Sequence, residues 1–473
     1  MGSNVPSIPA SIKQTVLLVL AFTALSVASA MATNPQETVL YSFQGPPDGL
    51  YPVGRLASDS AGNLYGATTQ GGTGPQTCEL GTCGTVFELS PPSTSGSAWT
   101  ETILYNFTGH SFGDGNAPWG GPIWGKGGKL YGITAYGGSG PCLLLGTPSG
   151  CGAVYELSPP ATRGGAWTEK VIYSFQGGND GHLPVGELVL DPQGNLYGAT
   201  SYGGGLGTCN GFYGFCGTIF ELSPPVTQGG AWTEKVLYSF NGGADGALPN
   251  GGLILDATGA LYGTAQYGGN SGCTNTSGTG CGVVFELTPP ASQGASWSQS
   301  VIYAFNPSVI PDGAVPMAGL IFDKKGNLFG TASGGGTAKT EPYGVAFRLS
   351  PPQTVGQAWI ERLLFSFGDG RSGGFLTAPL VLDSHGNLYG VASSAGAHSG
   401  GTALTLKPPT STGGKWSCII TYSFDVAPNA SAPAGPLNFG KGGVRYGVTF
   451  VGGTGSNCIT GINGCGAVYS IAP

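Results

Sequence analysis

A block that returns seven times is the feature that most restricts what this chain can fold into. The most regular part of the block is a five-residue run, Gly-Asn-Leu-Tyr-Gly or a close variant. Its copies start 66, 66, 65, 67, 60 and 57 residues apart, at residues 62, 128, 194, 259, 326, 386 and 443. This period is longer than those of ankyrin, tetratricopeptide or leucine-rich repeats. It leaves room in each unit for four short strands and two long loops.

The residue types inside a block predict four strands. In the third block, 187–191 is an apolar run that ends in a turn, 195–200 (NLYGAT) follows, 217–222 (GTIFEL) ends at two prolines, and 232–240 is WTEKVLYSF. Aromatic and β-branched residues favour strands, and clusters of Gly, Pro, Asn and Asp separate them. Four-stranded units repeated radially form a β-propeller. We therefore predict an all-β, seven-bladed propeller, with strands named a to d from the axis outward.

The two ends of the repeat region predict how the ring closes. Residues 37–43 (ETVLYSF) resemble a strand d without a preceding strand a, and 467–471 (AVYSI) resemble a strand c without a following strand d. Pairing them would remove two exposed strand edges, which otherwise template aggregation. The alternative is an open solenoid or two half-domains, but no block boundary resembles a linker. We predict one domain over residues 33–473.

Composition and charge exclude several function classes. Gly (89) and Pro (35) are abundant, but only 9% of the 473 residues are charged and 40% are hydrophobic, so the chain can bury a large core and is not disordered. The net charge is −7 and there is no cluster of Lys and Arg. This excludes a basic footprint for nucleic acid and argues against binding to an anionic membrane surface.

The N-terminal residues resemble an export signal. Lys13 precedes an apolar run over 16–27, and small residues follow in two Ala-x-Ala patterns at 28–32. The run is too short to span a bilayer, which takes about 20 residues. We predict a signal peptide over residues 1–32 and a secreted, extracellular or periplasmic protein without a transmembrane segment. An uncleaved anchor and a short core helix are the alternatives.

Ten of the 11 cysteines form local pairs at the same point of the repeat. Four to eight residues separate the members of a pair, and the chain has only four His, so the spacings do not fit a zinc site. An exported protein can hold disulfides. We predict five loop disulfides and no metal or cofactor. The pairs are Cys78/Cys83, Cys142/Cys151, Cys209/Cys216, Cys273/Cys281 and Cys458/Cys465. The eleventh, Cys418, is interpreted as a buried apolar group or a free thiol.

The repeat also resembles a known family. The run L-Y-G-x-T-x-x-G-G, a Gly-rich loop and then G-x-V-F-x-L is similar to the GloVer (Gloeo-Verruco) tandem repeat of bacterial extracellular proteins. It occurs here as LYGATTQGG at 64–72 with GTVFEL at 84–89, and as LYGATSYGG at 196–204 with GTIFEL at 217–222. The sixth copy departs most, because its third strand is GTALTL. The resemblance implies a propeller-like architecture and export, and supplies no catalytic residue.

The loops that vary between blades lie on one face. In an antiparallel blade the b–c and d–a loops share a face, and function is usually carried by varied loops on a rigid scaffold. Six Asp residues each precede Gly there, and Asp-Gly is a strong turn signal. We interpret them as structural turn residues, with a calcium-binding or substrate-binding ring as the alternative. They are Asp48, Asp114, Asp180, Asp245, Asp312 and Asp369.

Aromatic residues that break the repeat are the candidate ligand-binding residues. They fall in the loops of the neighbouring blades 2 and 3, where they predict one exposed apolar patch suited to stacking on sugar rings. The alternative is that the loops bury these side chains on themselves. The candidates are Trp119, Tyr136, Tyr202, Phe212, Tyr213 and Phe215. The Trp that recurs at the start of each strand d is instead predicted to pack between blades.

No catalytic motif is evident. The His residues follow no metal motif, no G-x-S-x-G element precedes a helix, and the strand-a positions are mostly Gly, Leu, Ile, Val and Phe. We therefore expect no set of polar residues in the central channel. A carboxylate pair for glycosidic cleavage stays open, because spacing in the fold is not visible in a sequence. The predicted function is an exported, non-enzymatic binding or scaffold propeller that recognises a glycan or a cell-surface protein. A polysaccharide lyase or hydrolase and a structural envelope protein are the alternatives.

Overall fold

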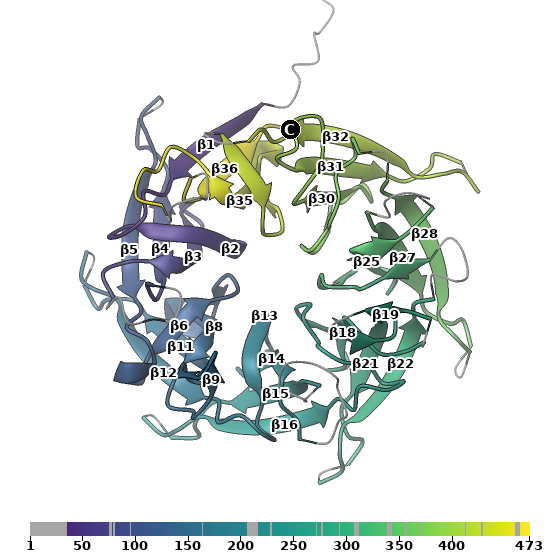
Figure 1. The fold of residues 1–473 in the computed structure, drawn as a ribbon, viewed down its shortest axis with the longest axis horizontal. Coiled ribbons are helices and arrows are strands. Elements are labelled where there is room, and N and C mark those ends of the chain that lie inside the picture. Colours follow the sequence, from purple (N-terminus) through teal and green to yellow (C-terminus); the bar gives the residue numbers. More distant parts are fainter. Residues whose placement is uncertain are drawn as a thin grey trace, which may run out of the picture. The chain divides into compact units, whose positions relative to one another are not determined.

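Each of the seven repeats forms an antiparallel sheet, and the sheets are arranged as blades around a central axis (Figure 1). The all-β, seven-bladed propeller is therefore confirmed. The computed structural model describes residues 36–473 except 75–77, 79–80, 95, 163, 206–215, 228, 271, 276–277, 293, 307–311, 338–342, 355–356, 369, 412, 427–428 and 459–463. The predicted signal peptide lies outside the described residues. Residues 37–473 form one compact unit.

Blades 1 and 3 have the longest inner strands, and the inner strand of blade 2 between them is divided into two short pieces. Blade 1 consists of β2 (Gly49–Ser58), β3 (Leu64–Gly71), β4 (Thr85–Ser90) and β5 (Thr100–Asn106). Blade 2 consists of β6 (Gly115–Pro118), β7 (Ile123–Trp124), β8 (Leu130–Gly137), β11 (Ala153–Ser158) and β12 (Thr168–Ser174). Blade 3 consists of β13 (His182–Leu190), β14 (Leu196–Tyr202), β15 (Thr218–Ser223) and β16 (Thr233–Ser239).

Blades 4 to 6 have inner strands of only two residues. Blade 4 consists of β17 (Ile254–Leu255), β18 (Leu261–Ala265), β21 (Val283–Thr288) and β22 (Ser298–Ala304). Blade 5 consists of β24 (Ile321–Phe322), β25 (Leu328–Ala332), β27 (Val345–Ser350) and β28 (Ile360–Ser366). Blade 6 consists of β29 (Val381–Leu382), β30 (Leu388–Ala392), β31 (Thr402–Lys407) and β32 (Ser417–Ser423).

Blade 7 is built from both ends of the propeller. It consists of β33 (Ala430–Pro433), β34 (Asn438–Phe439), β35 (Arg445–Gly452), β36 (Ala467–Ile471) and β1 (Glu37–Ser42). β1 runs antiparallel to β36, with Glu37 opposite Ile471 and Ser42 opposite Ala467. The next residue, Phe43, is fully buried. The predicted closure of the ring by the N-terminal strand is thus confirmed.

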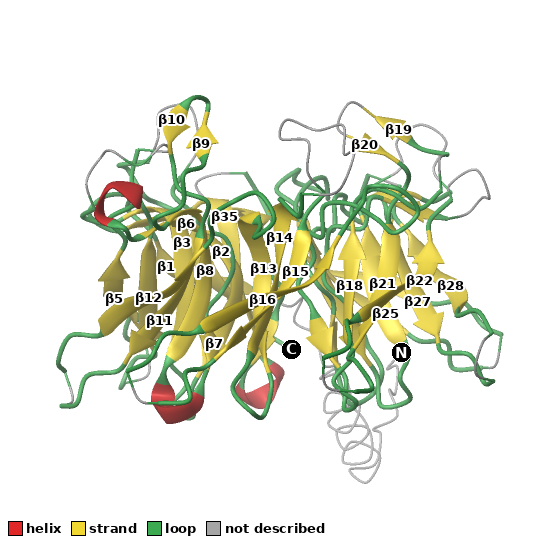
Figure 2. Ribbon diagram, turned by 90° about the horizontal axis from the view of Figure 1, so that it is seen from below, coloured by secondary structure: helices red, strands yellow, loops and turns green. Residues whose placement is uncertain are grey.

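The remaining elements are short and lie in loops. Two-stranded pairs are β9 (Leu143–Leu144) with β10 (Thr147–Pro148), β19 (Thr274–Asn275) with β20 (Gly278–Thr279), and β23 (Gly313–Ala314) with β26 (Gly334–Gly335). Single 3-10 turns are η1 (His110–Phe112), η2 (Lys126–Gly128) and η3 (Lys441–Gly443). The β9–β10 and β19–β20 hairpins project from the same face of the propeller (Figure 2). This is the face of the b–c loops.

The glycine of the repeated Leu-Tyr-Gly run is a packing requirement. Gly198 in β14 lies opposite Phe220 in β15, and a Cβ on Gly198 would overlap the ring of Phe220. That ring in turn makes an edge-to-face contact with Phe175, at the end of the preceding blade's strand d, with centroids 5.0 Å apart. The run therefore ties the second, third and fourth strands of neighbouring blades into one core.

The recurring Trp residues pack between blades, as predicted. Trp232 in blade 3 meets the ring of Tyr131 in blade 2 at 5.7 Å, and Trp297 in blade 4 meets Tyr197 in blade 3 at 6.3 Å. Similar contacts join Trp99 with Tyr446, Trp167 with Tyr65, Trp359 with Tyr262 and Trp416 with Phe329. The blades are therefore held by a repeated aromatic contact near each outer edge.

Disulfide bonds cross-link the b–c loops. The bonds Cys78–Cys83, Cys142–Cys151, Cys273–Cys281 and Cys458–Cys465 are formed. Cys216 is also disulfide-bonded, and Cys209, its predicted partner, lies outside the described residues. Cys418 carries a half-buried thiol that packs in the core of blade 6. Among the residues that the structure describes, no helix is long and apolar enough to cross a membrane.

Candidate functional site

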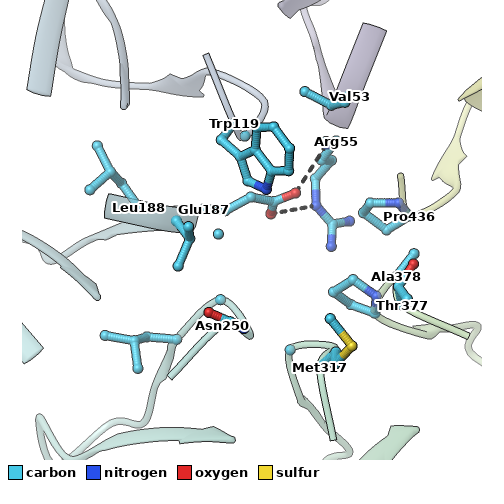
Figure 3. Close-up of a pocket in the computed structure, with 18 of the residues that line it drawn as sticks. Val53, Arg55, Trp119, Glu187, Leu188, Asn250, Met317, Thr377, Ala378 and Pro436 are labelled. Carbon is cyan, nitrogen blue, oxygen red and sulfur yellow. Dashed lines mark hydrogen bonds and ion pairs between the residues drawn. The ribbon is translucent and has the colours of Figure 1, made fainter. Parts of the chain in front are cut away.

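A cavity of about 950 Å³ lies at the centre of the propeller and is lined by inner-strand segments of all seven blades (Figure 3). Each inner segment contains one non-glycine residue with positive φ, between 53° and 61°, at or just before the stretch that lines the cavity. These residues are Tyr51, Ala117, Leu183, Leu248, Val315, Phe375 and Ala432. The repeat thus brings equivalent positions of seven blades to one space.

Two positions of the inner segment supply most of the variation in the cavity wall. The first, two residues after the positive-φ residue, lines the cavity in every blade and holds Val53, Trp119, Val185, Asn250, Met317, Thr377 and Ala434. The second, two residues further on, is Gly or Pro in five blades. In blades 1 and 3 it is Arg55 and Glu187. Charge therefore enters the cavity at two places where the repeat is broken.

Arg55 and Glu187 form an ion pair across the inner end of blade 2. Arg55 Nε lies 3.1 Å from Glu187 Oε2, and the backbone N–H of Arg55 donates to Glu187 Oε1 at 3.1 Å. The side chains are 34% and 22% exposed. This pair corrects the expectation that the central channel would carry no polar set. That expectation was wrong because the charged residues occupy one position in only two inner strands and do not dominate their composition.

Glycines in blade 2 allow the ion pair to form. A Cβ on Gly121 would overlap the carbonyl oxygen of Arg55, and a Cβ on Gly120 would overlap the carbonyl oxygen of Gly186. Any larger residue would push blades 1 and 3 away from blade 2. The two glycines therefore set the separation at which Glu187 reaches Arg55.

Three of the predicted aromatic residues line this same cavity. Trp119 is 46% exposed, and Figure 3 shows its indole beside the Arg55–Glu187 pair. Tyr136 and Tyr202 are half-buried and stand at the ends of β8 and β14. The other three, Phe212, Tyr213 and Phe215, lie outside the described residues. The structure thus brings Trp119, Tyr136 and Tyr202 together, and their role in binding stays a prediction.

A chain of hydrogen bonds fixes a further polar group of the wall, the amide of Asn250. Ser201 Oγ donates to Asn250 Oδ1 at 2.7 Å, and Asn250 Nδ2 donates to Gln266 Oε1 at 2.6 Å. Gln266 Nε2 donates to the hydroxyl of Tyr267 at 3.0 Å. Ser201 belongs to blade 3 and the others to blade 4, so the chain crosses a blade boundary at the cavity wall.

The repeated turn acids have partners within their own turns. Asp114 accepts hydrogen bonds from the hydroxyl of Tyr105 at 2.9 Å and from the backbone N–H of Thr108 at 2.7 Å. Asp48, Asp180, Asp245 and Asp312 accept equivalent bonds from Tyr41, Tyr173, Tyr238 and Tyr303. Asp369 lies outside the described residues. No group of three His, Cys, Asp or Glu suited to a metal ion occurs among the residues that the structure describes. A turn-stabilising role stays our interpretation of these acids.

Half-buried glutamates that the sequence analysis did not single out lie next to these acids. Burial, with repulsion from Asp48, raises the pKa of Glu101 to about 8. Burial also raises the pKa of Glu169 to about 8, with repulsion from Asp114. The recurrence of Glu in the repeated Trp-Thr-Glu run is the sequence feature from which these glutamates could have been recognised. These groups lie between outer strands and not in the cavity, so they belong to the energetics of the blades.

A comparison with known protein families shows which family the chain belongs to. The Gloeobacter/Verrucomicrobia repeat matches residues 26–277 and 272–473. The chain belongs to the Gloeobacter/Verrucomicrobia repeat family. The resemblance expected from the repeated Leu-Tyr-Gly runs is therefore confirmed. None of the curated proteins compared matches this member of the family.

Several solved structures are similar to this Gloeobacter/Verrucomicrobia repeat protein. PorZ, a surface component of the type-IX secretion system of Porphyromonas gingivalis, is 15% identical with a TM-score of 0.46, over 86% of this chain and 46% of that chain. A glucose dehydrogenase is 13% identical with a TM-score of 0.43, over 93% of this chain and 100% of that chain. PhoX of Pseudomonas fluorescens is 11% identical with a TM-score of 0.41, over 93% and 95%. We draw no inference about activity from these values.

Proposed function

We propose that this protein is an exported, non-enzymatic binding propeller that takes a glycan at its central cavity. The observation that carries the proposal is the gathering of Trp119, Tyr136 and Tyr202 on one cavity of about 950 Å³. A mostly apolar, aromatic cavity with a few placed polar groups is typical of ligand sites. The face of a sugar ring stacks on aromatic side chains, and its hydroxyls need donors and acceptors of the kind that Arg55, Glu187 and Asn250 offer.

The carboxylate content of the cavity favours binding over cleavage. Glycosidases of the common kinds place two carboxyl groups about 5–10 Å apart on either side of the scissile bond. Among the described residues that line the cavity, Glu187 is the one carboxylate, and it is ion-paired with Arg55. A polysaccharide lyase or hydrolase is therefore the second candidate. The notable feature in its favour is that the charged pair breaks the repeat inside the channel.

The disulfides support the export part of the proposal. Disulfides form and persist in oxidising compartments and are rare in the cytosol. The four bonds with both partners described lie at equivalent points of the repeat. Together with the apolar run over 16–27, they favour a mature protein that begins after residue 30 or 32, outside the cytoplasm. A protein partner on the cell surface is the alternative to a glycan.

The proposal predicts binding without product release. Residues 33–473 should be depleted from solution by at least one of cellulose, chitin, xylan or a mixed-linkage glucan, and no soluble sugar should appear. Because Trp119 offers the largest exposed apolar face in the cavity, we expect Trp119→Ala to weaken this binding at least tenfold. Depletion is measured by absorbance of the supernatant, and release by a reducing-sugar assay.

A matched control variant distinguishes binding in the cavity from nonspecific adsorption through exposed aromatic residues. Phe112 is 67% exposed in η1, on the face of the b–c loops, and does not line the cavity, so Phe112→Ala should bind like the wild type. Released sugar would replace the binding proposal with the enzyme. Absence of depletion by every polysaccharide, or equal loss in both variants, would reject the cavity as a glycan site.

A further inference from the structure

We infer that Arg55 and Glu187 form a preformed polar subsite for two neighbouring hydroxyls of an uncharged saccharide. This inference rests on the proposed function and deepens it, because it names the polar contact and the charge class of the ligand.

The fold does not need a charged pair at this position. Five blades close with Gly or Pro at the equivalent place: Gly121, Gly252, Gly319, Pro379 and Pro436. Residues of that kind allow inner strands to approach closely. Arg55 and Glu187 add two long side chains and hold both partly out of water, where even a paired charge adds little net stability because desolvation offsets the attraction. Their presence in the cavity therefore requires an explanation other than blade closure.

Both members of the pair keep hydrogen-bonding capacity directed at the cavity. A guanidinium has five N–H donors, and the contacts with Glu187 use only Nε–H of the Arg55 side chain. Figure 3 shows the terminal nitrogens of Arg55 directed into the open space. Each oxygen of Glu187 accepts one bond from Arg55 and has a second lone pair. The pair thus presents donors and acceptors side by side, which is what two adjacent hydroxyls require.

The charge of the wall favours an uncharged ligand. Among the described lining residues, Arg55 is the one cation and Glu187 the one anion, and they neutralise each other. A ligand carboxylate on Arg55 would lie against Glu187, and a ligand cation on Glu187 would lie against Arg55. Repulsion of this kind is stronger at a partly buried site than in water. A neutral hydroxyl pair meets neither penalty.

The surroundings of the pair fit the shape of a sugar ring. Trp119 lies beside it with an exposed aromatic face, Pro436 lies next to Arg55, and Met317 and Ala378 lie across the cavity (Figure 3). A pyranose has apolar C–H faces and a polar rim of hydroxyls. Stacking one face on Trp119 would bring the rim to Arg55 and Glu187.

The test restores the residue that the repeat itself prefers. In Arg55→Gly/Glu187→Gly, both blades regain the glycine that blades 2, 4 and 5 carry, so we expect the thermal midpoint to stay close to that of the wild type. Binding of neutral oligosaccharides prepared from the polysaccharide that the wild type binds should weaken at least tenfold. Glu187→Gln, which keeps the size of the side chain but loses its charge, should weaken it to an intermediate extent. Isothermal titration measures all three proteins.

A second ion pair serves as the control, and charged sugars test the ligand class. Lys129 and Glu156 are 2.7 Å apart and lie outside the cavity, so Lys129→Gln should bind like the wild type. Oligogalacturonides should bind at least tenfold more weakly than neutral oligosaccharides. Unchanged binding by the glycine variant, or tighter binding of oligogalacturonides, would overturn this inference while the glycan proposal stands. No saccharide binding by the wild type would remove both.

Discussion

A protein that lacks β1 should lose most of its free energy of unfolding. Expression of residues 45–473 removes the strand that completes blade 7 and with it Phe43, which is fully buried. Truncation of a buried Phe alone costs about 3–5 kcal/mol. Whole domains are stable by only about 5–15 kcal/mol. The deletion also exposes the edge of β36 to pairing with other chains. We therefore expect a loss of cooperative unfolding in denaturant and aggregation by light scattering.

A circular permutant tests whether the pairing of β1 with β36, and not the covalent link from β1 to β2, stabilises the ring. In this protein the chain starts at Gly45, and Pro473 is joined to residues 36–44 through a copy of residues 92–99, from the c–d loop of blade 1. β36 and β1 then form an ordinary hairpin with the same register. The permutant should unfold within about 1 kcal/mol of the intact protein. A stable truncated protein, or a permutant as unstable as the truncation, would contradict the role of β1 in closing the ring.

Redundancy explains why the fold could be predicted from the sequence. Seven copies show which residues a blade requires, so that Gly198 and the Trp of strand d are recognised by recurrence alone. Recurrence also gave the phase of the repeat. A chain that begins on a strand d and ends on a strand c closes in one way, and the pairing of β1 with β36 follows.

The candidate site was predictable only where it departs conspicuously from the repeat. Trp119 differs in size and type from its counterparts in the other blades. Tyr136 and Tyr202 share their repeat position with Tyr267 of blade 4, and they were singled out because they begin the varied loops of blades 2 and 3; all three candidates line one cavity. Arg55 and Glu187 differ as strongly from the Gly or Pro of the other blades. They are overlooked when only the average composition of the inner strands is considered. An alignment of the inner segments position by position would have shown both. Their pairing would still be hidden, because they are 132 residues apart and meet across a third blade.

Acidic pairs between blades should make the propeller less stable as the pH rises. A glutamate of strand d lies beside the turn acid and the strand-d tyrosine of the preceding blade, and Glu169 also faces Tyr155. The four groups of three residues are Glu101 with Asp48 and Tyr41, Glu169 with Asp114 and Tyr105, Glu234 with Asp180 and Tyr173, and Glu361 with Asp312 and Tyr303. Burial, with repulsion from the neighbouring Asp, holds the pKa of Glu234 and Glu361 at about 7, and that of the other two at about 8.

The direction of the pH dependence follows from the difference in glutamate pKa between the folded and unfolded chains. In the unfolded chain these carboxyls ionise near pH 4.5, and in the folded protein near 7 to 8. The folded state holds the proton more tightly, so each site stabilises the protein fully below about pH 4.5. This stabilisation is lost as the pH rises through 8. One pKa unit corresponds to about 1.4 kcal/mol, and screening of these partly exposed groups reduces the effect to on the order of 1 kcal/mol per site.

Blade 4 has an uncharged glutamine in place of the strand-d glutamate. Gln299 stands at the position of the glutamates, and its Nε2 donates to the backbone oxygen of Asp245 at 3.2 Å. An amide has the shape of a protonated carboxyl and cannot ionise. The four-fold variant Glu101→Gln/Glu169→Gln/Glu234→Gln/Glu361→Gln should therefore match the wild type near pH 5. At pH 9 it should exceed the wild type by about 4 kcal/mol, the sum of the four sites.

The reverse substitution provides a matched test in the same protein. Gln299→Glu should be close to neutral at pH 5 and should destabilise the protein by on the order of 1 kcal/mol at pH 9. Urea unfolding at intervals between these pH values measures each difference from the wild type. His182 acts in the opposite direction, because burial lowers its pKa to about 4 and its stabilisation is lost as the pH falls below 6.5. It is common to all three proteins and cancels in the differences. Parallel stability curves for the wild type and both variants would show that the glutamates are ionised between the blades, with solvent or neighbouring groups compensating the charge.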